Sequence, residues 1–238
     1  MKIGIMQPYF FPYIGYWQLM NAVDQYVVYD DVNFIKGGWI NRNRILIGNE
    51  AKYYNVQMVG AGSYKKINEI YVEHKKEVLE KKLRTLKNAY CKAPYFNKIF
   101  PIIQDIILNE NENLAKYLMN SIKIIHDYLN MKSILLFSSE IKKDNEKSGA
   151  QKVIEICNIL NADTYYNAVG GQDLYSFSEF KENGLYLKFL KTKEVEYKQF
   201  NDKFIPNLSI IDVMMFNSKE KVKEYLYLYD LIEDNGEK

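Results

Sequence analysis

Two short apolar segments near the start of the chain constrain its fold most strongly. The first covers Lys2–Met6 and is followed by a loop that contains Pro8 and Pro12, and the second covers Gln25–Tyr29. Residues Gly15–Val23 between them have the apolar pattern of a short helix. Two strands joined through a helix lie parallel, so these thirty residues predict a parallel βαβ unit. The loops of such a unit meet at the carboxyl edge of the sheet, where ligands bind.

The same alternation of strands and helices returns in the second half of the chain. Strands are predicted at Ser133–Phe137, Asp163–Val169 and Tyr186–Leu190, one or two more within Ile45–Val59, and helices at Lys147–Leu160, Ser209–Asn217 and Lys219–Leu231. This order favours an α/β class with a Rossmann-like parallel sheet.

The middle of the chain, about residues 64–130, has a different pattern. Apolar residues at helical spacing predict amphipathic helices at Asn68–Asn88, Tyr95–Leu108 and Asn113–Leu129. Neither a low-complexity linker nor an internal repeat divides the sequence. We therefore predict a single α/β domain over residues 1–238, in which residues 64–130 form a helical insertion or subdomain.

Charge and cysteine content limit the classes of partner. The 32 basic residues nearly balance the 30 acidic ones, which argues against an extended nucleic-acid surface and favours a small anionic substrate. Cys91 and Cys157 stand apart with no Cys/His cluster beside them, so neither a metal site nor a disulfide is expected. No segment has the length of apolar sequence that spans a membrane, and we expect a cytoplasmic protein with no membrane partner.

The segment between the first strand and the first helix is a candidate site. Tyr13 and Tyr16 offer phenolic donors one helical turn apart, and Gly15 would let a phosphate or ribose approach the backbone. Gln7 and Tyr9 are candidate substrate-binding residues beside them. The alternative is that the aromatic residues of this segment only pack the first loop.

A second candidate site follows the second strand. Asp30 and Asp31 end that strand and are candidate catalytic groups that accept a proton from, or orient, an amine. Lys36, Trp39, Asn41, Arg42 and Asn43 in the following loop are candidate substrate-binding residues.

Arginine usage supports this choice. Only three of the 32 basic residues are arginines, and Arg42 and Arg44 fall within a stretch of four residues, whereas Arg84 stands alone. The planar guanidinium fork recognises phosphate or carboxylate in a way that lysine cannot reproduce. The alternative is a structural loop in which Arg42 pairs internally with Asp30 or Asp31.

Two further segments could contribute to substrate binding. Gly170 and Gly171 follow a predicted strand and permit close approach to a ligand, with Asp173 opening a helix behind them. The alternative is an ordinary turn with Asp173 as a helix N-cap. Ser209 and Asp212 have the spacing of a capping box, and either side chain could also face the site.

Several motifs resemble known families. Tyr13-Ile14-Gly15-Tyr16 has the spacing of the HIGH motif of nucleotidyltransferases and class I aminoacyl-tRNA synthetases, with tyrosine at both histidine positions, and the turn at Asn167–Asp173 is similar to one in pantothenate synthetase, an amide ligase of that superfamily. Over most of its length the chain resembles the WbqC-like family, in the segments MQPYFFPYIGYWQL, DDVNFIKGGWINRNRI, YCKAPYF, LFSSE, ADTYYNAVGGQDLY and FIPNLSIIDVMMFN.

The resemblance implies a bacterial protein of surface-polysaccharide or modified-sugar pathways. We therefore expect a transferase or ligase that joins a small acyl or aminoacyl group to an amine, such as that of an amino sugar on a nucleotide carrier. The co-substrate stays open between a nucleotide, an acyl-CoA and an aminoacyl-tRNA. The alternatives are a nucleotidyltransferase acting on a nucleoside triphosphate and a non-catalytic module that binds a sugar nucleotide or a partner. The oligomeric state is left open.

Overall fold

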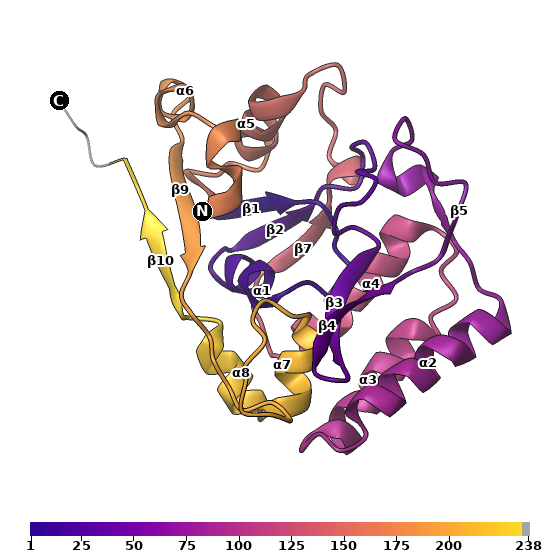
Figure 1. Cartoon of the computed structure of the whole chain (residues 1–238). Helices are drawn as coiled ribbons and strands as arrows, with labels where there is room; N and C mark the ends of the chain where they lie inside the picture. The colour runs from indigo at the N-terminus through magenta and orange to yellow at the C-terminus, as the bar shows by residue number, and fades with distance from the viewer. Residues whose placement is uncertain (235–238) are drawn as a thin grey trace.

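A six-stranded sheet forms the centre of the protein in the computed structural model, which describes residues 1–234 (Figure 1). The sheet has the order β10-β9-β8-β1-β2-β7, and every neighbouring pair is parallel except β9 and β10. Its strands are β1 (Lys2–Met6), β2 (Gln25–Val28), β7 (Ile134–Phe137), β8 (Thr164–Ala168), β9 (Tyr186–Thr192) and β10 (Tyr229–Ile232). The five parallel strands have the doubly wound order 3-2-1-4-5, which confirms the predicted Rossmann-like α/β fold.

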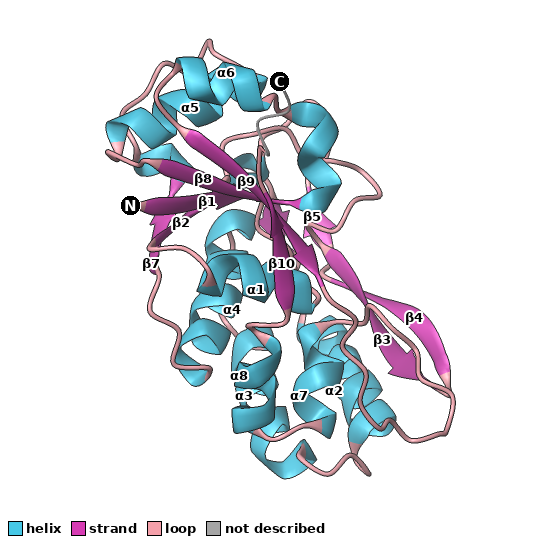
Figure 2. Cartoon of the chain, turned by 90° about the vertical axis from the view of Figure 1, so that its left-hand side faces the viewer, coloured by secondary structure: helices cyan, strands magenta, loops and turns pink. Residues whose placement is uncertain are grey.

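Helices cover both faces of the sheet, so that the protein has three layers (Figure 2). On one face lie α5 (Gly149–Ile159) and α6 (Phe177–Glu182), which bury Ile3 and Ile5 of β1. The other face carries α1 (Ile14–Asn21), whose Leu19 lies against Gly4. Because β1 has apolar residues on one face and the small Gly4 on the other, α1 can approach the sheet closely.

The helices predicted for the middle of the chain are present. They are α2 (Lys76–Tyr90), α3 (Phe96–Ile107) and α4 (Leu114–Tyr128), and they lie on the same side of the sheet as α1. The first residues of the predicted helix Asn68–Asn88 instead belong to a 3-10 turn, η1 (Ile67–Glu69), and to strand β6 (Tyr71–Val72), which pairs with β5 (Met58–Val59). The backbone hydrogen bonds of this pairing compete with those of a helix, and α2 therefore begins at Lys76.

A β-hairpin follows the loop after β2. It consists of β3 (Arg42–Ile47) and β4 (Glu50–Asn55), and its turn residues Gly48 and Asn49 have φ angles of 57° and 68°. Both angles are those of a type I′ turn, in which glycine and asparagine are favoured.

The C-terminal prediction is partly wrong. Helices α7 (Ile210–Phe216) and α8 (Lys219–Tyr225) are present, but the helix predicted to continue to Leu231 ends at Tyr225. The following residues form β10, antiparallel to β9. Strand β9 would otherwise leave its backbone groups unpaired at the sheet edge, and β10 satisfies them.

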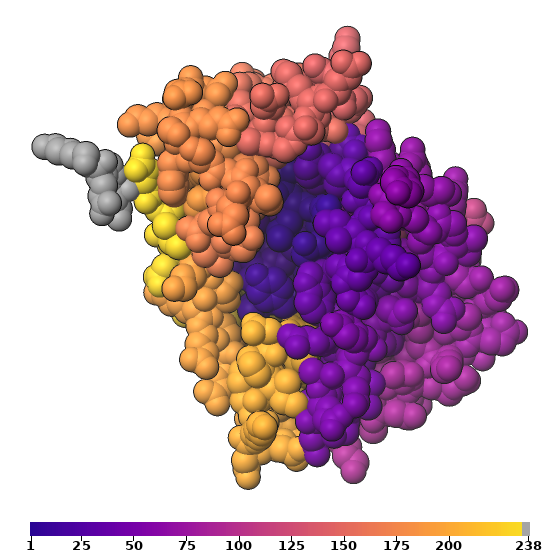
Figure 3. All heavy atoms as spheres, turned by 45° about the horizontal axis from the view of Figure 1, so that its top comes forward, coloured from indigo at the N-terminus to yellow at the C-terminus, as the bar shows by residue number. Residues whose placement is uncertain are grey.

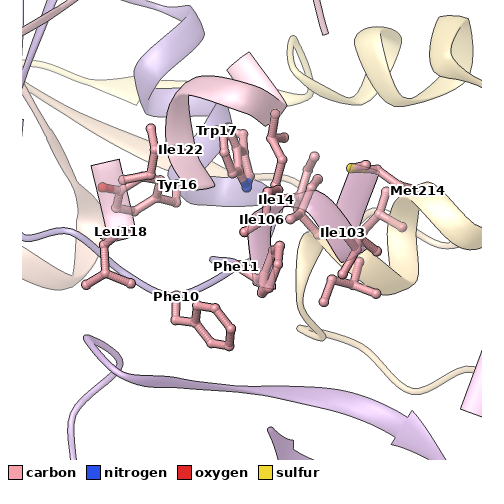
Figure 4. Packing of buried hydrophobic residues seen from close by; sticks show 14 of the residues in the cluster. Phe10, Phe11, Ile14, Tyr16, Trp17, Ile103, Ile106, Leu118, Ile122 and Met214 are labelled. Carbon is pink, nitrogen blue, oxygen red and sulfur yellow. The ribbon is translucent and has the colours of Figure 1, made fainter. Parts of the chain in front are cut away.

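Much of the aromatic segment after β1 belongs to the core. Phe10, Phe11, Tyr16 and Trp17 are almost completely buried (Figure 4). They pack against the middle helices and α7, through Ile103, Ile106, Leu118, Ile122 and Met214. For these four residues the packing interpretation of the segment holds.

Candidate functional site

A cavity of about 270 Å³ lies where three segments of the chain meet. It is lined by Tyr9 and Tyr13 from the loop after β1, Trp39 from the loop after β2, Asn43 and Arg44 from β3, and Asn207 from the loop before α7. We call it the aromatic cavity. The loop after β1 leaves the sheet next to β8, where the strand order reverses and ligands of this fold class bind. Figure 3 shows a hollow whose floor is formed by N-terminal residues, in indigo, between violet and orange atoms.

The two tyrosines that line the cavity, Tyr9 and Tyr13, are half-buried and remain protonated at neutral pH. Burial raises the pKa of Tyr9, and the neighbouring Tyr13 raises it further. Burial also raises the pKa of Tyr13, against the effect of a hydrogen bond with Thr192. Each phenol is therefore a neutral hydrogen-bond donor rather than a base.

Arg44 supplies the positive charge of the aromatic cavity. Its guanidinium lies 5.8 Å from the centre of the Trp39 ring, and one terminal nitrogen donates to the carbonyl oxygen of Asn207 at 3.3 Å. Its Nε is buried and has no hydrogen-bond partner among the described residues. The side chain of Asn43 accepts from the backbone N–H of Arg44 at 2.8 Å. The cavity thus offers a guanidinium beside aromatic rings.

Ser209 joins the three segments that line the aromatic cavity. Its backbone N–H donates to the carbonyl of Arg44, and its hydroxyl donates to the carbonyl of Phe11, both at 2.8 Å. The next residue, Ile210, donates to the carbonyl of Pro12 at 3.0 Å. Phe11 has a φ of 44°, a left-handed conformation that is unfavourable for a bulky residue. The hydrogen bond from Ser209 helps to hold it there.

The structure therefore gives Ser209 and Asp212 roles away from the cavity surface. The Ser209 hydroxyl also accepts from the N–H of Ile211 and caps α7, as predicted. Asp212 does not complete a capping box, because its oxygens accept from Tyr90 at 2.9 Å, Tyr197 at 2.7 Å and Gln199 at 2.8 Å. Burial raises the pKa of Asp212, although these three hydrogen bonds favour its charged form.

The HIGH-like segment is not arranged as predicted. Tyr16 is buried, and its hydroxyl donates to the carbonyl of Gln7 at 3.1 Å, so that it does not face the cavity. Gly15 is also buried. A Cβ built on it would lie 2.5 Å from Cε2 of Tyr13 and 2.5 Å from Oγ1 of Thr192. The prediction that a phosphate approaches the Gly15 backbone is therefore wrong, because the Tyr13 ring and the Thr192 hydroxyl fill that space.

Arg42, the arginine predicted to bind the substrate, instead stabilises the loop that precedes it. Nε of Arg42 donates to the carbonyl of Gly38 at 3.0 Å, a terminal nitrogen donates to that of Gly37, and the guanidinium stacks on Tyr53 at 4.4 Å. Asn41 donates to the carbonyl of Val56 at 3.3 Å. Lys36 is exposed at the same turn and does not line the cavity.

The two aspartates after β2 lie apart from the aromatic cavity. Asp30 is buried and accepts from the backbone N–H and the hydroxyl of Ser139, at 2.9 and 2.6 Å. Asp31 pairs with Lys143 at 2.7 Å and with Lys152 at 3.6 Å, and all three side chains are buried. The alternative in which Arg42 pairs with an aspartate is thus wrong.

The state of Asp31 follows from this pairing. Burial alone would raise the pKa of Asp31, but the hydrogen bond from Lys143 and the charges of both lysines outweigh it and hold the pKa below its ordinary value. Asp31 is therefore an ionised structural partner. Neither aspartate reaches the cavity in which Tyr13 lies, and the predicted assembly of tyrosines and aspartates into one centre does not occur.

The glycine-containing turn after β8 also lies outside the aromatic cavity. Gly170, Gly171 and Asp173 belong to a 3-10 turn, η3 (Val169–Leu174). The side chain of Asn167 occupies the space beside Gly171, and Asp173 is exposed. The N-cap of α6 is Ser176, so Asp173 does not open a helix.

Two of the residues that line the cavity, Arg44 and Asn207, are not among the candidate residues predicted from the sequence. The clustering of two arginines within four residues pointed to a segment that lines the cavity, but not to which of the two arginines lines it. For Asn207 no local pattern was available, because its segment reaches the cavity only through the contacts of Ser209.

Residues 1–234 contain no group of three or more His, Cys, Asp or Glu side chains that could hold a metal ion. Among the same residues, no helix combines the length and the apolar character needed to cross a membrane.

Comparison with known proteins assigns the family. The chain is 25% identical over 228 residues to an uncharacterized protein of Mycobacterium tuberculosis, Rv1507c, with 94% of this chain and 97% of that protein covered. No solved structure matches the chain significantly. A model of the WbqC-like protein family matches residues 7–224, and the chain thus belongs to this family.

Proposed function

We propose that the aromatic cavity binds the anionic part of an amino sugar on a nucleotide carrier, and that the protein transfers a small acyl or aminoacyl group to the amine of that sugar. The observation that carries this proposal is the position of Arg44 beside Tyr9, Tyr13 and Trp39 in one cavity. Aromatic rings provide apolar surface for a sugar ring, and the guanidinium fork matches a phosphate or a carboxylate. The amide of Asn43 suits hydroxyl groups.

The chemistry is an acyl transfer from a thioester or ester donor. The amine nitrogen forms a bond to the carbonyl carbon, the bond from that carbon to the carrier sulfur or oxygen breaks, and one amine proton ends on the leaving group. Charge develops on the carbonyl oxygen during this step. A protonated Tyr13 can donate a hydrogen bond to that oxygen, and its raised pKa keeps the donor in place at neutral pH.

A second candidate is a binding protein for the same ligand. It is favoured by the cavity lining itself, since the residues that line it include no Asp, Glu or His that could accept a proton. In that case the protein would bind the sugar nucleotide without turnover.

The test measures binding of UDP-glucosamine by calorimetry to wild type, Arg44→Ala and Arg44→Lys. Removing the guanidinium removes a charge-assisted contact of about 1.5–3 kcal/mol, so affinity should fall about ten- to hundred-fold in Arg44→Ala. Arg44→Lys keeps the charge but not the guanidinium fork, so its affinity should lie between those of wild type and Arg44→Ala. Arg84→Ala is the matched control, because Arg84 pairs with Glu80 on the exposed side of α2.

Unchanged affinity in Arg44→Ala would contradict the proposed binding site. Mass spectrometry after incubation with acetyl-CoA and with aminoacyl-tRNAs then separates the two candidates. Acylated UDP-glucosamine identifies a transferase, whereas binding without product across these donors identifies a binding protein.

A further inference from the structure

One face of the hairpin β3–β4 carries two arginines and a tyrosine outside the core. Arg44 and Tyr53 are directly opposite each other in the register of the hairpin, and Arg42 lies two residues before Arg44. Because side chains alternate between the two faces of a strand, these three residues project from the same face. Residues that alternate with them, such as Ile45 and Tyr54, are buried.

Trp39 from the preceding loop joins this face. The centres of the Trp39 and Tyr53 rings are 6.2 Å apart. Arg42 lies 4.4 Å from the centre of the Tyr53 ring, and Arg44 lies 5.8 Å from that of Trp39. The two rings are 39% and 58% exposed, Trp39 less than Tyr53. We call these four residues the arginine–aromatic cluster.

The positive charge of the cluster is not neutralised within the part of the chain that the structure describes. No carboxylate of residues 1–234 forms an ion pair with Arg42 or Arg44, whereas the third arginine, Arg84, pairs with Glu80 at 3.8 Å. Within the same residues, the hydrogen bonds from Arg42 and Arg44 go to neutral backbone carbonyl groups. An anionic ligand would therefore meet two guanidinium groups beside exposed aromatic rings.

This combination of side chains suits a nucleotide. Nucleobases stack on aromatic rings and on the planes of guanidinium groups, and the phosphates attached to them pair with arginine. A purely apolar partner would cover the rings but would also bury the guanidinium groups without an anion, which is costly. The charge of the cluster thus favours a nucleotide over an apolar peptide.

The cluster also continues the aromatic cavity in a suitable direction. Trp39 and Arg44 line that cavity, whereas Arg42 and Tyr53 lie outside it. Sugar, phosphate and base follow one another in a sugar nucleotide. The same order is available from Tyr13 inside the cavity, through Arg44, to the exposed ring of Tyr53.

We propose that the arginine–aromatic cluster binds the nucleobase of the nucleotide carrier, with the base against the exposed surfaces of Trp39 and Tyr53 and the adjoining phosphates beside Arg44. This inference rests on the proposed function, in which the sugar in the aromatic cavity is carried by a nucleotide. Arg42 is a positioning residue, because its hydrogen bond to Gly38 and its contact with Tyr53 hold that ring in place. Every base has a π-face, so the stack selects a nucleotide over a free sugar phosphate rather than one base over another.

Calorimetry with UDP and with glucosamine 1-phosphate tests the base and the sugar separately. Tyr53→Ala removes a ring that lies outside the aromatic cavity, so the affinity for UDP should fall about five- to hundred-fold, while that for glucosamine 1-phosphate stays unchanged. UDP-glucosamine should lose the same factor as UDP. Tyr53→Phe keeps the ring and should bind UDP like wild type.

Tyr64→Ala is the matched control, because Tyr64 is 98% exposed in the loop after β5 and belongs to neither the aromatic cavity nor the cluster. It should leave the affinity for UDP unchanged. Thermal unfolding verifies that all three variants fold.

Fluorescence of Trp39 gives an independent measurement. The chain contains two tryptophans, and the other, Trp17, is completely buried. A base that stacks on Trp39 quenches the emission of its indole ring. UDP should therefore quench the fluorescence of wild type but not that of Trp39→Phe.

Three results would overturn the inference. The first is an unchanged affinity for UDP in Tyr53→Ala, or no quenching in wild type. The second is a dependence on Tyr53 for coenzyme A but not for UDP, which would assign the rings to the donor. The third is a dimer in gel filtration that Tyr53→Ala dissociates, which would assign them to a second copy of the chain.

The same measurements separate this inference from the proposed function. If the affinity for UDP-glucosamine depended on Arg44 but not on Tyr53, the proposed function would stand without the base site. If UDP binding depended on Tyr53 but glucosamine 1-phosphate did not bind, the base site would remain and the proposed sugar site would be wrong.

Discussion

Gly15 is the residue on which the shape of the aromatic cavity depends most directly. In Gly15→Ala the new Cβ would lie 2.5 Å from both Tyr13 and Thr192, so the Tyr13 ring must move. Alanine also favours helix more than glycine by about 0.5–1 kcal/mol, which offsets part of the packing cost. We therefore expect a small change in thermal stability and a marked loss of UDP-glucosamine affinity.

The control for this prediction is Gly170→Ala, because a Cβ at Gly170 meets no heavy atom within 4 Å. It should change neither the thermal stability nor the affinity for UDP-glucosamine. If Gly15→Ala bound the probe like wild type, the position of Tyr13 against Gly15 would not matter for the site.

The sequence could point to a segment that lines the candidate site, but not to which residues of that segment line it. The rarity of arginine indicated the segment of Arg42 and Arg44. Which of the two guanidiniums lines the cavity depends on the path of the loop, because the carbonyl groups of Gly37 and Gly38 accept hydrogen bonds from Arg42. Likewise, two consecutive aspartates predicted a catalytic pair, whereas the bonds of Asp31 to Lys143 and Lys152 come from residues more than a hundred positions away.

Among elements, the end of β2 is attached to α5 by a buried ion pair. Replacing Asp31 by Asn leaves Lys143 and Lys152 buried without their anion, and loss of one partner of a buried pair costs about 3–5 kcal/mol. We expect a corresponding fall in the free energy of unfolding, measured in urea. Lys123→Ala, which breaks an exposed pair with Asp127, should cost less than about 1 kcal/mol.

The same ion pair predicts a dependence on pH. The pKa of Asp31 lies below its ordinary value of 3.8 in the folded state, so its contribution to stability is complete above that value and is lost as the pH falls through the lower, folded pKa. Asp31→Asn should lack this component. An equal loss of stability in acid for wild type and Asp31→Asn would contradict the assignment.

Most elements could be predicted because their apolar residues repeat with a clear period. The parallel strands and the three middle helices follow from such periods. The exceptions are elements whose state depends on a distant partner: Tyr71–Val72 pairs with β5, and Tyr229–Ile232 pairs with β9. No local pattern distinguishes these residues from a continued helix, because the decisive hydrogen bonds are to other parts of the chain.

For the whole molecule, Ser209 links distant segments. Ser209→Ala removes the hydrogen bond to Phe11 and the cap of α7, which leaves a buried carbonyl unpaired at a cost of about 1–3 kcal/mol. We expect a melting temperature lower by about 2–4 °C for each 1 kcal/mol lost. Because Phe11 lies between Tyr9 and Tyr13, the affinity for UDP-glucosamine should fall as well.

Ser218→Ala is the matched control, since Ser218 caps α8 through the N–H of Lys221 but makes no contact with the cavity. It should lower the melting temperature less and leave the affinity unchanged. Equal effects of the two variants would show that Ser209 acts only as a helix cap.

The hydrogen bond between Ser209 and Phe11 spans 198 positions of the chain and also has a consequence for biosynthesis. On the ribosome, Tyr9, Tyr13, Trp39 and Arg44 are made early, but the segment that holds their loops together is made after nearly all of the sheet. A nascent chain therefore exposes its aromatic residues without a finished cavity. The proposed binding site is therefore complete only when residues 207–210 dock, and a chain that ends before them lacks one wall of the aromatic cavity.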